Sequence, residues 1–217
     1  MSTLPDTPIA LVYADDSLIV VNKPAGLLAV PGRGTDKADC MSLRVQQHFT
    51  NALVVHRLDQ ATSGLMLMAR GLVMQRNLNL MFETRKVDKT YVAIAHGLVA
   101  LDEGCIDLPL AADWPARPKQ KVDITAGKTA LTRYKVLARD VQNRSTRLEL
   151  APITGRTHQL RVHLCAIGHP IVGDALYGRT TASAHTTANR LLLHAQHLAL
   201  VHPEAGQTLE WHASAEF

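Results

Sequence analysis

The chain has 217 residues, enough for one large domain or two small ones. Its 47% hydrophobic and 19% charged residues are typical of a globular protein and exclude an intrinsically disordered chain. The net charge of +4 suits an anionic partner without requiring one. No segment approaches the roughly 20 apolar residues of a membrane span, so no membrane partner is expected. The widely spaced Cys40, Cys105 and Cys165 predict neither a disulfide framework nor a zinc site, and reduced thiols favour the cytoplasm.

The first half of the chain alternates short strand patterns with two helical patterns. Residues 1–8, with their two prolines, predict a flexible tail, and the opening residues lack the pattern of a secretory signal. The predicted elements, in chain order, are strands at 11–13 and 18–21 joined by an Asp15-Asp16 turn, a loop at 22–34, a helix at 42–49, a buried strand at 65–68 and a helix within 70–86.

The second half is richer in strands. Strand patterns occur at 90–99, 106–110, 129–138, 146–151 and 191–201, and a basic loop at 113–121 interrupts them. One helix is predicted after Thr157, its expected N-cap, and Gly168 with Pro170 ends it. Because strands outnumber helices in no regular βαβ order, we predict an α+β fold with a mixed, largely antiparallel sheet flanked by helices. One domain is expected over residues 9–217, with no linker inside it.

The most informative stretch of the sequence runs from His56 to Met68. Arg57 and Asp59 stand two residues apart, a turn-forming Thr-Ser-Gly follows, and then a run of large apolar residues. Catalytic groups are usually positioned by rigid elements of the fold, and an acid and a cation directly before a buried strand fit this arrangement.

This stretch resembles the signature H-R-L-D-x-x-T-S-G-L of the RluA family of pseudouridine synthases. Further blocks resemble the same family in order and spacing, over roughly residues 10–215: N-K-P-A-G-L at 22–27, K-T-Y-V-A at 89–93, T-G-R-T-H-Q-L-R-V-H at 154–163 and G-H-P-I-V-G-D-A-L-Y-G at 168–178. The N-terminal S4 RNA-binding domain frequent in the family has no counterpart here. The resemblance therefore implies a lone pseudouridine synthase domain that binds RNA by itself.

The resemblance implies isomerisation of specific uridines to pseudouridine in structured RNA. The compact layout is similar to family members that modify both rRNA and tRNA, here 23S rRNA and a tRNA anticodon stem-loop. No atoms leave the nucleotide except exchanged protons, so no cofactor is expected. The sequence likewise shows no P-loop, no dinucleotide-binding glycine pattern and no convincing metal cluster.

The resemblance also implies roles for individual residues. Asp59 is the essential carboxylate, and whether it attacks C1′, adds to C6 or removes a sugar proton stays open. Arg161 is implied as the cation that keeps this carboxylate ionised. Tyr91 is implied to stack on the uracil and to assist loss of the C5 proton, and Arg57 to fill the gap left by the flipped base. Arg156 is interpreted as a phosphate contact or a structural hydrogen-bond donor.

RNA binding is expected to rest on contacts between basic side chains and phosphates. The candidates are Lys23, Arg33, Lys37, Arg117, Lys119 and Lys121, with Trp114 as a stacking surface. His158, His163, His194 and His197 are interpreted as structural, because their spacings do not align them as ligand pairs, and no metal site is expected. A monomer without an obligate protein partner is the expected state.

Two other classes of protein remain as alternatives. A nucleosidase would also attack C1′ with a carboxylate, but it needs a second acid, and only Glu83, Asp88 or Asp174 is available without further support. A catalytically silent RNA-binding or ribosome-assembly protein would not need Asp59, Tyr91 and Arg161 together. Substitution of Asp59 separates this last alternative from a synthase.

Overall fold

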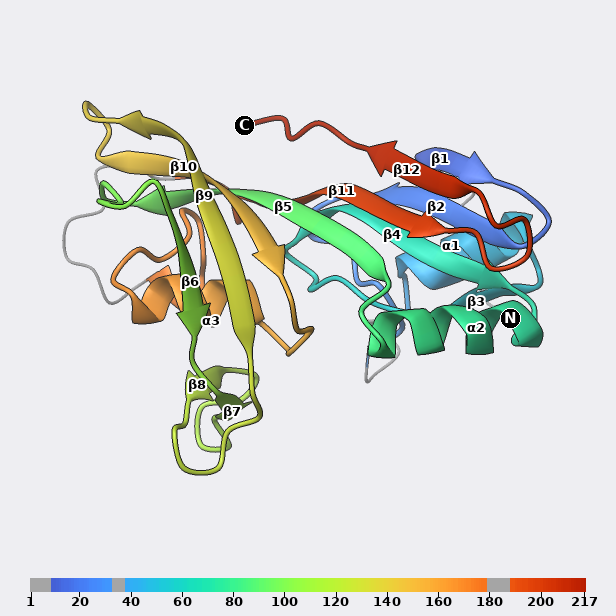
Figure 1. Cartoon of the computed structure of the whole chain (residues 1–217), viewed down its shortest axis with the longest axis horizontal. Coiled ribbons are helices and arrows are strands. Elements are labelled where there is room, and N and C mark those ends of the chain that lie inside the picture. The colour runs from blue at the N-terminus through green and yellow to red at the C-terminus, as the bar shows by residue number, and fades with distance from the viewer. Residues whose placement is uncertain (1–8, 33–37, 179–187) are drawn as a thin grey trace. The chain divides into compact units, whose positions relative to one another are not determined.

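The computed structural model describes residues 9–32, 38–178 and 188–217, so the expected tail at 1–8 lies outside the described residues. The chain divides into two compact units, one formed by Met1–Asp88 with Ala195–Glu216 and the other by Lys89–His194 with Phe217. The boundaries between the two units fall within two strands, β5 (Val87–His96) and β11 (Leu193–Val201) (Figure 1). The expectation of one domain over 9–217 stays a prediction.

The first unit is a largely antiparallel sheet with a helix on each face. Its further elements are β1 (Leu11–Ala14), β2 (Leu18–Lys23), α1 (Met41–His48), β3 (Ala52–Val54), β4 (Ser63–Arg70), α2 (Leu72–Glu83) and β12 (Thr208–His212). The strand order is β1-β2-β4-β11, with β3 also paired to β4 and β12 to β11.

Strand β4 is the core of this unit. Its apolar run is buried on both faces, since alternate residues point to opposite sides of the sheet. Leu65 and Leu67 pack with Leu78 of α2 in one apolar cluster, whereas Met66 and Met68 belong to the cluster that contains α1. The predicted buried strand is therefore confirmed, and its two-sided burial makes it a rigid support for the segment that precedes it.

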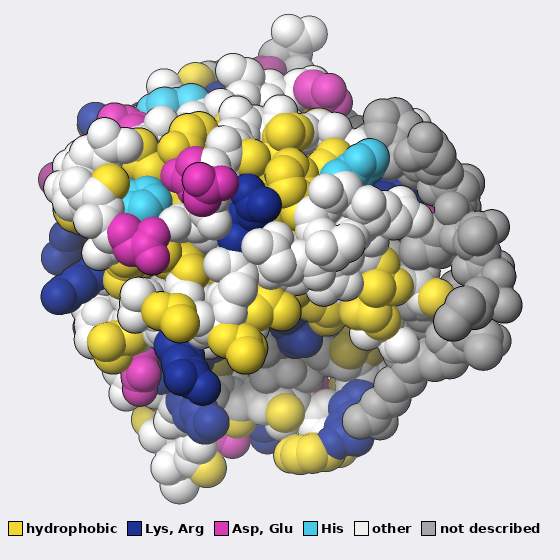
Figure 2. Space-filling model, turned by 90° about the vertical axis from the view of Figure 1, so that its right-hand side faces the viewer, with side chains coloured by type: hydrophobic (Ala, Val, Ile, Leu, Met, Phe, Trp, Pro, Cys, Tyr) yellow, Lys and Arg dark blue, Asp and Glu magenta, His cyan; other side chains and the backbone are white. Residues whose placement is uncertain are grey.

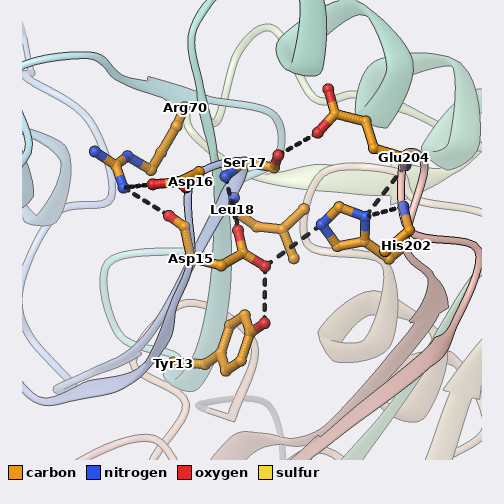
Figure 3. A network of polar contacts seen from close by, with 9 residues as sticks. Tyr13, Asp15, Asp16, Ser17, Leu18, Arg70, His202 and Glu204 are labelled. Atoms are coloured by element: carbon orange, nitrogen blue, oxygen red, sulfur yellow. Dashed lines mark hydrogen bonds and ion pairs between the residues drawn. The ribbon is translucent and has the colours of Figure 1, made fainter.

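A polar network joins the β1–β2 turn to the turn after β11 (Figure 3). Asp15 accepts hydrogen bonds from the Tyr13 hydroxyl and from the backbone N–H groups of Ser17 and Leu18, and it lies 3.4 Å from the ring of His202. Burial acts to raise the pKa of Asp15, but these donors and the nearby His202 hold it below its ordinary value. The network's contribution to stability is therefore present above the pKa of the unfolded state and is lost as the pH falls through the folded value.

The second unit is another antiparallel arrangement. Its further elements are β6 (Glu103–Asp107), β7 (Leu110–Ala112), β8 (Gln120–Val122), β9 (Leu131–Asp140), β10 (Ser145–Pro152) and α3 (Gln159–Ala166). The strand order is β5-β10-β9-β6, and β7 pairs with β8 in a small separate sheet. The α+β prediction is correct. Among the described residues, no helix is both long and apolar enough to cross a membrane.

Candidate active site

Asp59 is presented by the segment that enters β4. Leu58 is buried and anchors the segment, Arg57 is exposed, and Asp59 is half-buried. The N–H of Thr62 donates to the carbonyl of Asp59 over 3.1 Å, which closes a turn before the strand. The carboxylate is thus held on a tight turn against a buried strand.

Gly64 allows this turn to enter the sheet. Its φ is +115°, and a Cβ built on it would lie 2.3 Å from the carbonyl oxygen of Ala195 in β11. Any other residue would collide with backbone, which has no freedom to rotate away. Gly64, the glycine of the H-R-L-D-x-x-T-S-G-L signature, therefore allows β4 and β11 to approach closely just after Asp59.

Lys23 corrects the sequence analysis. It was expected to contact phosphate, yet its side chain is fully buried, so it does not offer its charge to RNA from the surface. Its Nζ donates to the carbonyl oxygens of Pro24, Leu27 and Gln60 over 2.9, 2.7 and 3.2 Å. Three acceptors match the three protons of an ammonium group. Because Gln60 follows Asp59, Lys23 ties the 24–27 loop to the catalytic segment.

The same loop is tied to the catalytic segment a second time. The N–H of Gly26 donates to the carbonyl of Gln60 over 2.8 Å, and the side-chain amide of Gln60 donates back to the carbonyl of Gly26 over 3.0 Å. Gly26 has a φ of +88°, which favours glycine. The N-K-P-A-G-L block therefore braces the residue next to Asp59.

Lys23 and Asp59 also interact through their charges. Burial lowers the pKa of Lys23 to about 8, while the charge of Asp59 acts in the opposite direction. At pH 7 the Lys23 ammonium is therefore mostly protonated. A mostly protonated Lys23 is thus buried within reach of the charge of Asp59.

We expect Lys23→Met to slow single turnover by about tenfold, because the variant loses the three hydrogen bonds that tie the 24–27 loop to the residue after Asp59. The check is the single-turnover rate at pH 7, with folding verified by circular dichroism. Lys86→Met, which removes an exposed cation of the same unit, is the control. A folded Lys23→Met variant that turns over at the wild-type rate would contradict the bracing role.

In the second unit, Tyr91 lies on β5 and is half-buried. Its cross-strand neighbour is Leu150 of β10, in the last pair of the β5–β10 register. Lys89, two residues earlier, has a pKa lowered by burial. The sheet thus holds Tyr91 firmly, with part of its surface exposed.

Arg161 lies on α3 and is 4% exposed. It forms a two-pronged ion pair with Asp174, with Nε and Nη2 at 2.7 and 2.8 Å from the two carboxylate oxygens. Asp174 also accepts from the N–H groups of Leu176 and Tyr177. Burial acts to raise the pKa of Asp174, but Arg161 and these N–H groups hold it below its ordinary value. The guanidinium is therefore fixed in orientation by a buried anion.

Asp174 is the residue that the sequence analysis missed. It was considered only as a second acid for hydrolysis, although it stands in the recognised G-x-P-I-x-G-D-x-x-Y-G block. Its place in this block was the signal in the sequence that could have identified it as a functional residue. Arg161 was expected to balance the charge of Asp59, and this role stays a prediction.

The start of α3 differs from expectation. The N-cap is His158, with a φ of +54° and no side-chain cap, rather than Thr157. Gln159 fixes the turn before the helix, because its Oε1 accepts from the N–H of Arg156 over 3.0 Å. The guanidinium Nε of Arg156 donates to the carbonyl of Thr129 over 2.9 Å, which fits the structural half of its interpretation. The left-handed residue thus replaces the usual serine or threonine cap.

His163 is confirmed as structural. It is fully buried, with Nδ1 2.9 Å from the Thr132 hydroxyl and Nε2 3.0 Å from the carbonyl of Leu108. Burial lowers its pKa, so the ring is neutral and joins α3 to β9. His158 Nδ1 lies 2.8 Å from the Tyr177 hydroxyl, which accepts from the N–H of Gln120.

The basic loop between β7 and β8 contains a stacked pair of side chains. The guanidinium of Arg117 lies over the ring of Trp114 at 3.4 Å, and the indole remains 66% exposed. Lys121 is exposed and lies 3.6 Å from Asp123, whereas Lys119 is half-buried. One face of the expected stacking surface is therefore occupied by Arg117. The stack gives the loop a fixed, cationic outer surface.

Two of the predicted phosphate contacts, Arg33 and Lys37, lie outside the described residues. On the face drawn in Figure 2, Lys and Arg side chains stand in separate small groups among apolar and neutral atoms. Contacts to phosphate on this face are therefore expected from individual cations rather than from one broad basic surface.

The largely antiparallel α+β fold therefore carries an Asp at the entrance of a buried strand and an Arg paired with a second Asp. The model of the RNA pseudouridylate synthase family matches residues 17–166. The chain belongs to this family. The solved structure of human RNA pseudouridylate synthase domain containing 1 covers 99% of this chain and 86% of its own, with a TM-score of 0.79 and 26% identity.

Similar proteins show to which type within this family the chain belongs. The chain is 51% identical over 207 residues to the dual-specificity RNA pseudouridine synthase RluA of Yersinia pestis, which covers 95% of this chain and 99% of that protein. It is 46% identical over 209 residues to the protein of the same name from Escherichia coli (strain K12), covering 96% and 94%. Within its family the chain is thus of the RluA type, and it is an RNA pseudouridine synthase, an isomerase.

Proposed function

We propose that the protein converts specific uridines in both rRNA and tRNA to pseudouridine, with Asp59 as its essential carboxylate. The observation that carries the proposal is the support built around Asp59. A buried strand, a braced loop and the buried Lys23 ammonium hold one ionisable side chain at a half-exposed position. Two substrate classes are proposed because the relatives at 51% and 46% identity are named dual-specificity enzymes.

The reaction rearranges a single nucleotide. The N1–C1′ bond breaks, the uracil turns, and C5 forms the new bond to C1′. The C5 proton then leaves to solvent and N1 regains a proton, so atoms and electrons balance without an oxidant or reductant. Attack of Asp59 on C1′, addition to C6 and removal of a sugar proton all begin from the ionised carboxylate.

Tyr91 and Arg161 are proposed to act in the same reaction. The flat ring of Tyr91 stacks on the uracil, and its hydroxyl assists loss of the C5 proton. Arg161 supplies positive charge, and the pair with Asp174 fixes the direction of its guanidinium. Binding of the RNA relies on exposed cations, among them Arg117 and Lys121, and on the Trp114–Arg117 stack.

The testing experiment is release of tritium from C5-tritiated uridine in total rRNA and tRNA transcripts. C5 loses its hydrogen only when it becomes the glycosidic carbon. Release from both RNAs is the expected result. Release from one alone would restrict the substrate, and tight binding with no release from either would overturn the proposal.

We also propose that the protein is a monomer and lies in the cytoplasm. Sedimentation tests the first statement, and cell fractionation tests the second.

Arg57 is proposed to fill the space left by the flipped uridine, because its guanidinium is exposed beside Asp59 and is planar. Arg57→Ala is expected to slow single turnover on folded RNA by about ten- to a hundredfold, since flipping costs a few kcal/mol. The effect should shrink on an unstructured oligonucleotide, where the base is already unstacked. Arg76→Ala removes an exposed arginine of α2 and is the control. Equal slowing on both RNAs would contradict the gap-filling role.

A further inference from the structure

The strands β11 and β12 bring two histidines face to face. They pair antiparallel, and His197 stands directly opposite His212 in the register. Glu210 lies two residues before His212 and therefore projects from the same face of the strand. Figure 1 shows the two strands side by side in the C-terminal part of the chain. Residues 13 and 15 positions apart in the sequence thus meet on one surface.

The potential ligand atoms of the three side chains converge. The Nε2 atoms of His197 and His212 lie 2.8 and 3.0 Å from the same oxygen of Glu210. The imidazole centroids are 4.5 Å apart, and one nitrogen or oxygen from each residue lies within 4.8 Å of the others. The His197 side chain is 16% exposed, whereas those of Glu210 and His212 are 57% and 61% exposed. One ligand is thus held by packing, and the other two are open to solvent.

We infer that His197, Glu210 and His212 form a surface site for a first-row transition metal ion of the zinc class, which would clamp β11 to β12. Two imidazoles and one carboxylate suit Zn²⁺, Ni²⁺ or Cu²⁺. In a tetrahedral zinc site the ligand atoms lie about 3.3 Å apart, given metal–ligand bonds of roughly 2.0–2.1 Å. The nitrogen–oxygen distances of 2.8 and 3.0 Å need to open only slightly, and the exposed Glu210 side chain has room to move.

The sequence predicts no metal site and a structural role for His197. That prediction rests on the spacing of His194 and His197, which places them on opposite faces of one strand. The partner is supplied instead by another strand, through pairing. The remaining coordination positions face solvent and would be filled by water, so the site is structural in kind and independent of the pseudouridine chemistry.

The test is calorimetric titration of the untagged full-length protein with ZnSO₄, together with Co²⁺ absorption as a reporter of coordination geometry. The wild type is expected to bind one equivalent and to unfold at a higher temperature with the metal present. His212→Ala is expected to weaken affinity at least about tenfold. Glu210→Gln, which keeps the side-chain shape, is expected to act in the same direction and decides the matter if His212→Ala fails to fold. His48→Ala, which removes an exposed histidine of α1, is the control.

The proposal is overturned if the wild type binds Zn²⁺ no more tightly than the folded variants do. It is also overturned if His48→Ala weakens binding as much as the site variants, because the metal would then sit on scattered histidines. Tritium release should continue in the presence of a chelator. Loss of the clamp with retained isomerase activity separates this site from the proposed catalytic function.

Discussion

Replacing Asp59 by Asn is expected to abolish pseudouridine formation, with a fall in rate of at least about a thousandfold, or about 4 kcal/mol of activation free energy. Asn has nearly the same shape but can neither attack as an anion nor accept a proton as a base. Asp59 is half-buried on a tight turn, so an isosteric amide leaves the packing of Leu58 and β4 unchanged. RNA affinity is expected to stay close to that of the wild type.

The measurement is tritium release beside equilibrium RNA binding for the wild type and Asp59→Asn. Asp88→Asn removes an exposed carboxylate near the end of the same unit and is the matched control. An Asp59→Asn enzyme that still releases label at the wild-type rate would remove the carboxylate from the mechanism. Unchanged activity in cells would instead favour the catalytically silent RNA-binding protein.

The second large effect concerns stability. Asp174→Ala is expected to lower the free energy of unfolding by about 3–5 kcal/mol, because it leaves the buried Arg161 charge without its anion. The Asp174 side chain is 0% exposed and Arg161 only 5%. The loss also strips two backbone N–H groups of their acceptor. Asp174→Asn, which keeps one acceptor oxygen but no charge, is expected to fall between Asp174→Ala and the wild type.

Urea denaturation at pH 7 measures the difference. The control is Asp102→Ala, since Asp102 also pairs with an arginine, Arg139, at 2.7 Å but is 84% exposed. That loss is expected to be below about 1 kcal/mol. Because the pKa of Asp174 is lowered in the folded state, its contribution is lost as the pH falls through that value. Equal losses for the two variants would show that burial of the Arg161 pair adds nothing.

Local sequence was sufficient for most of the fold. The predicted strands at 11–13, 18–21 and 65–68 correspond to β1, β2 and β4, and the helix predicted within 70–86 corresponds to α2. The periodic spacing of apolar residues in these segments predicts each element. The short strands β3, β8 and β12 were missed, because three to five residues are too few to carry a periodic signal and such strands form by pairing with a neighbour.

The sequence by itself determined the α+β class, the buried strand behind Asp59 and the family blocks, since each is written in contiguous residues. Tertiary structure decided the partners. It buried Lys23 against Gln60, paired Arg161 with Asp174 and set His197 opposite His212. The physical reason is that the groups around a charged side chain decide whether it is solvated, forms an ion pair or joins a cluster of ligands. Those groups come from distant positions whose meeting depends on strand register and packing.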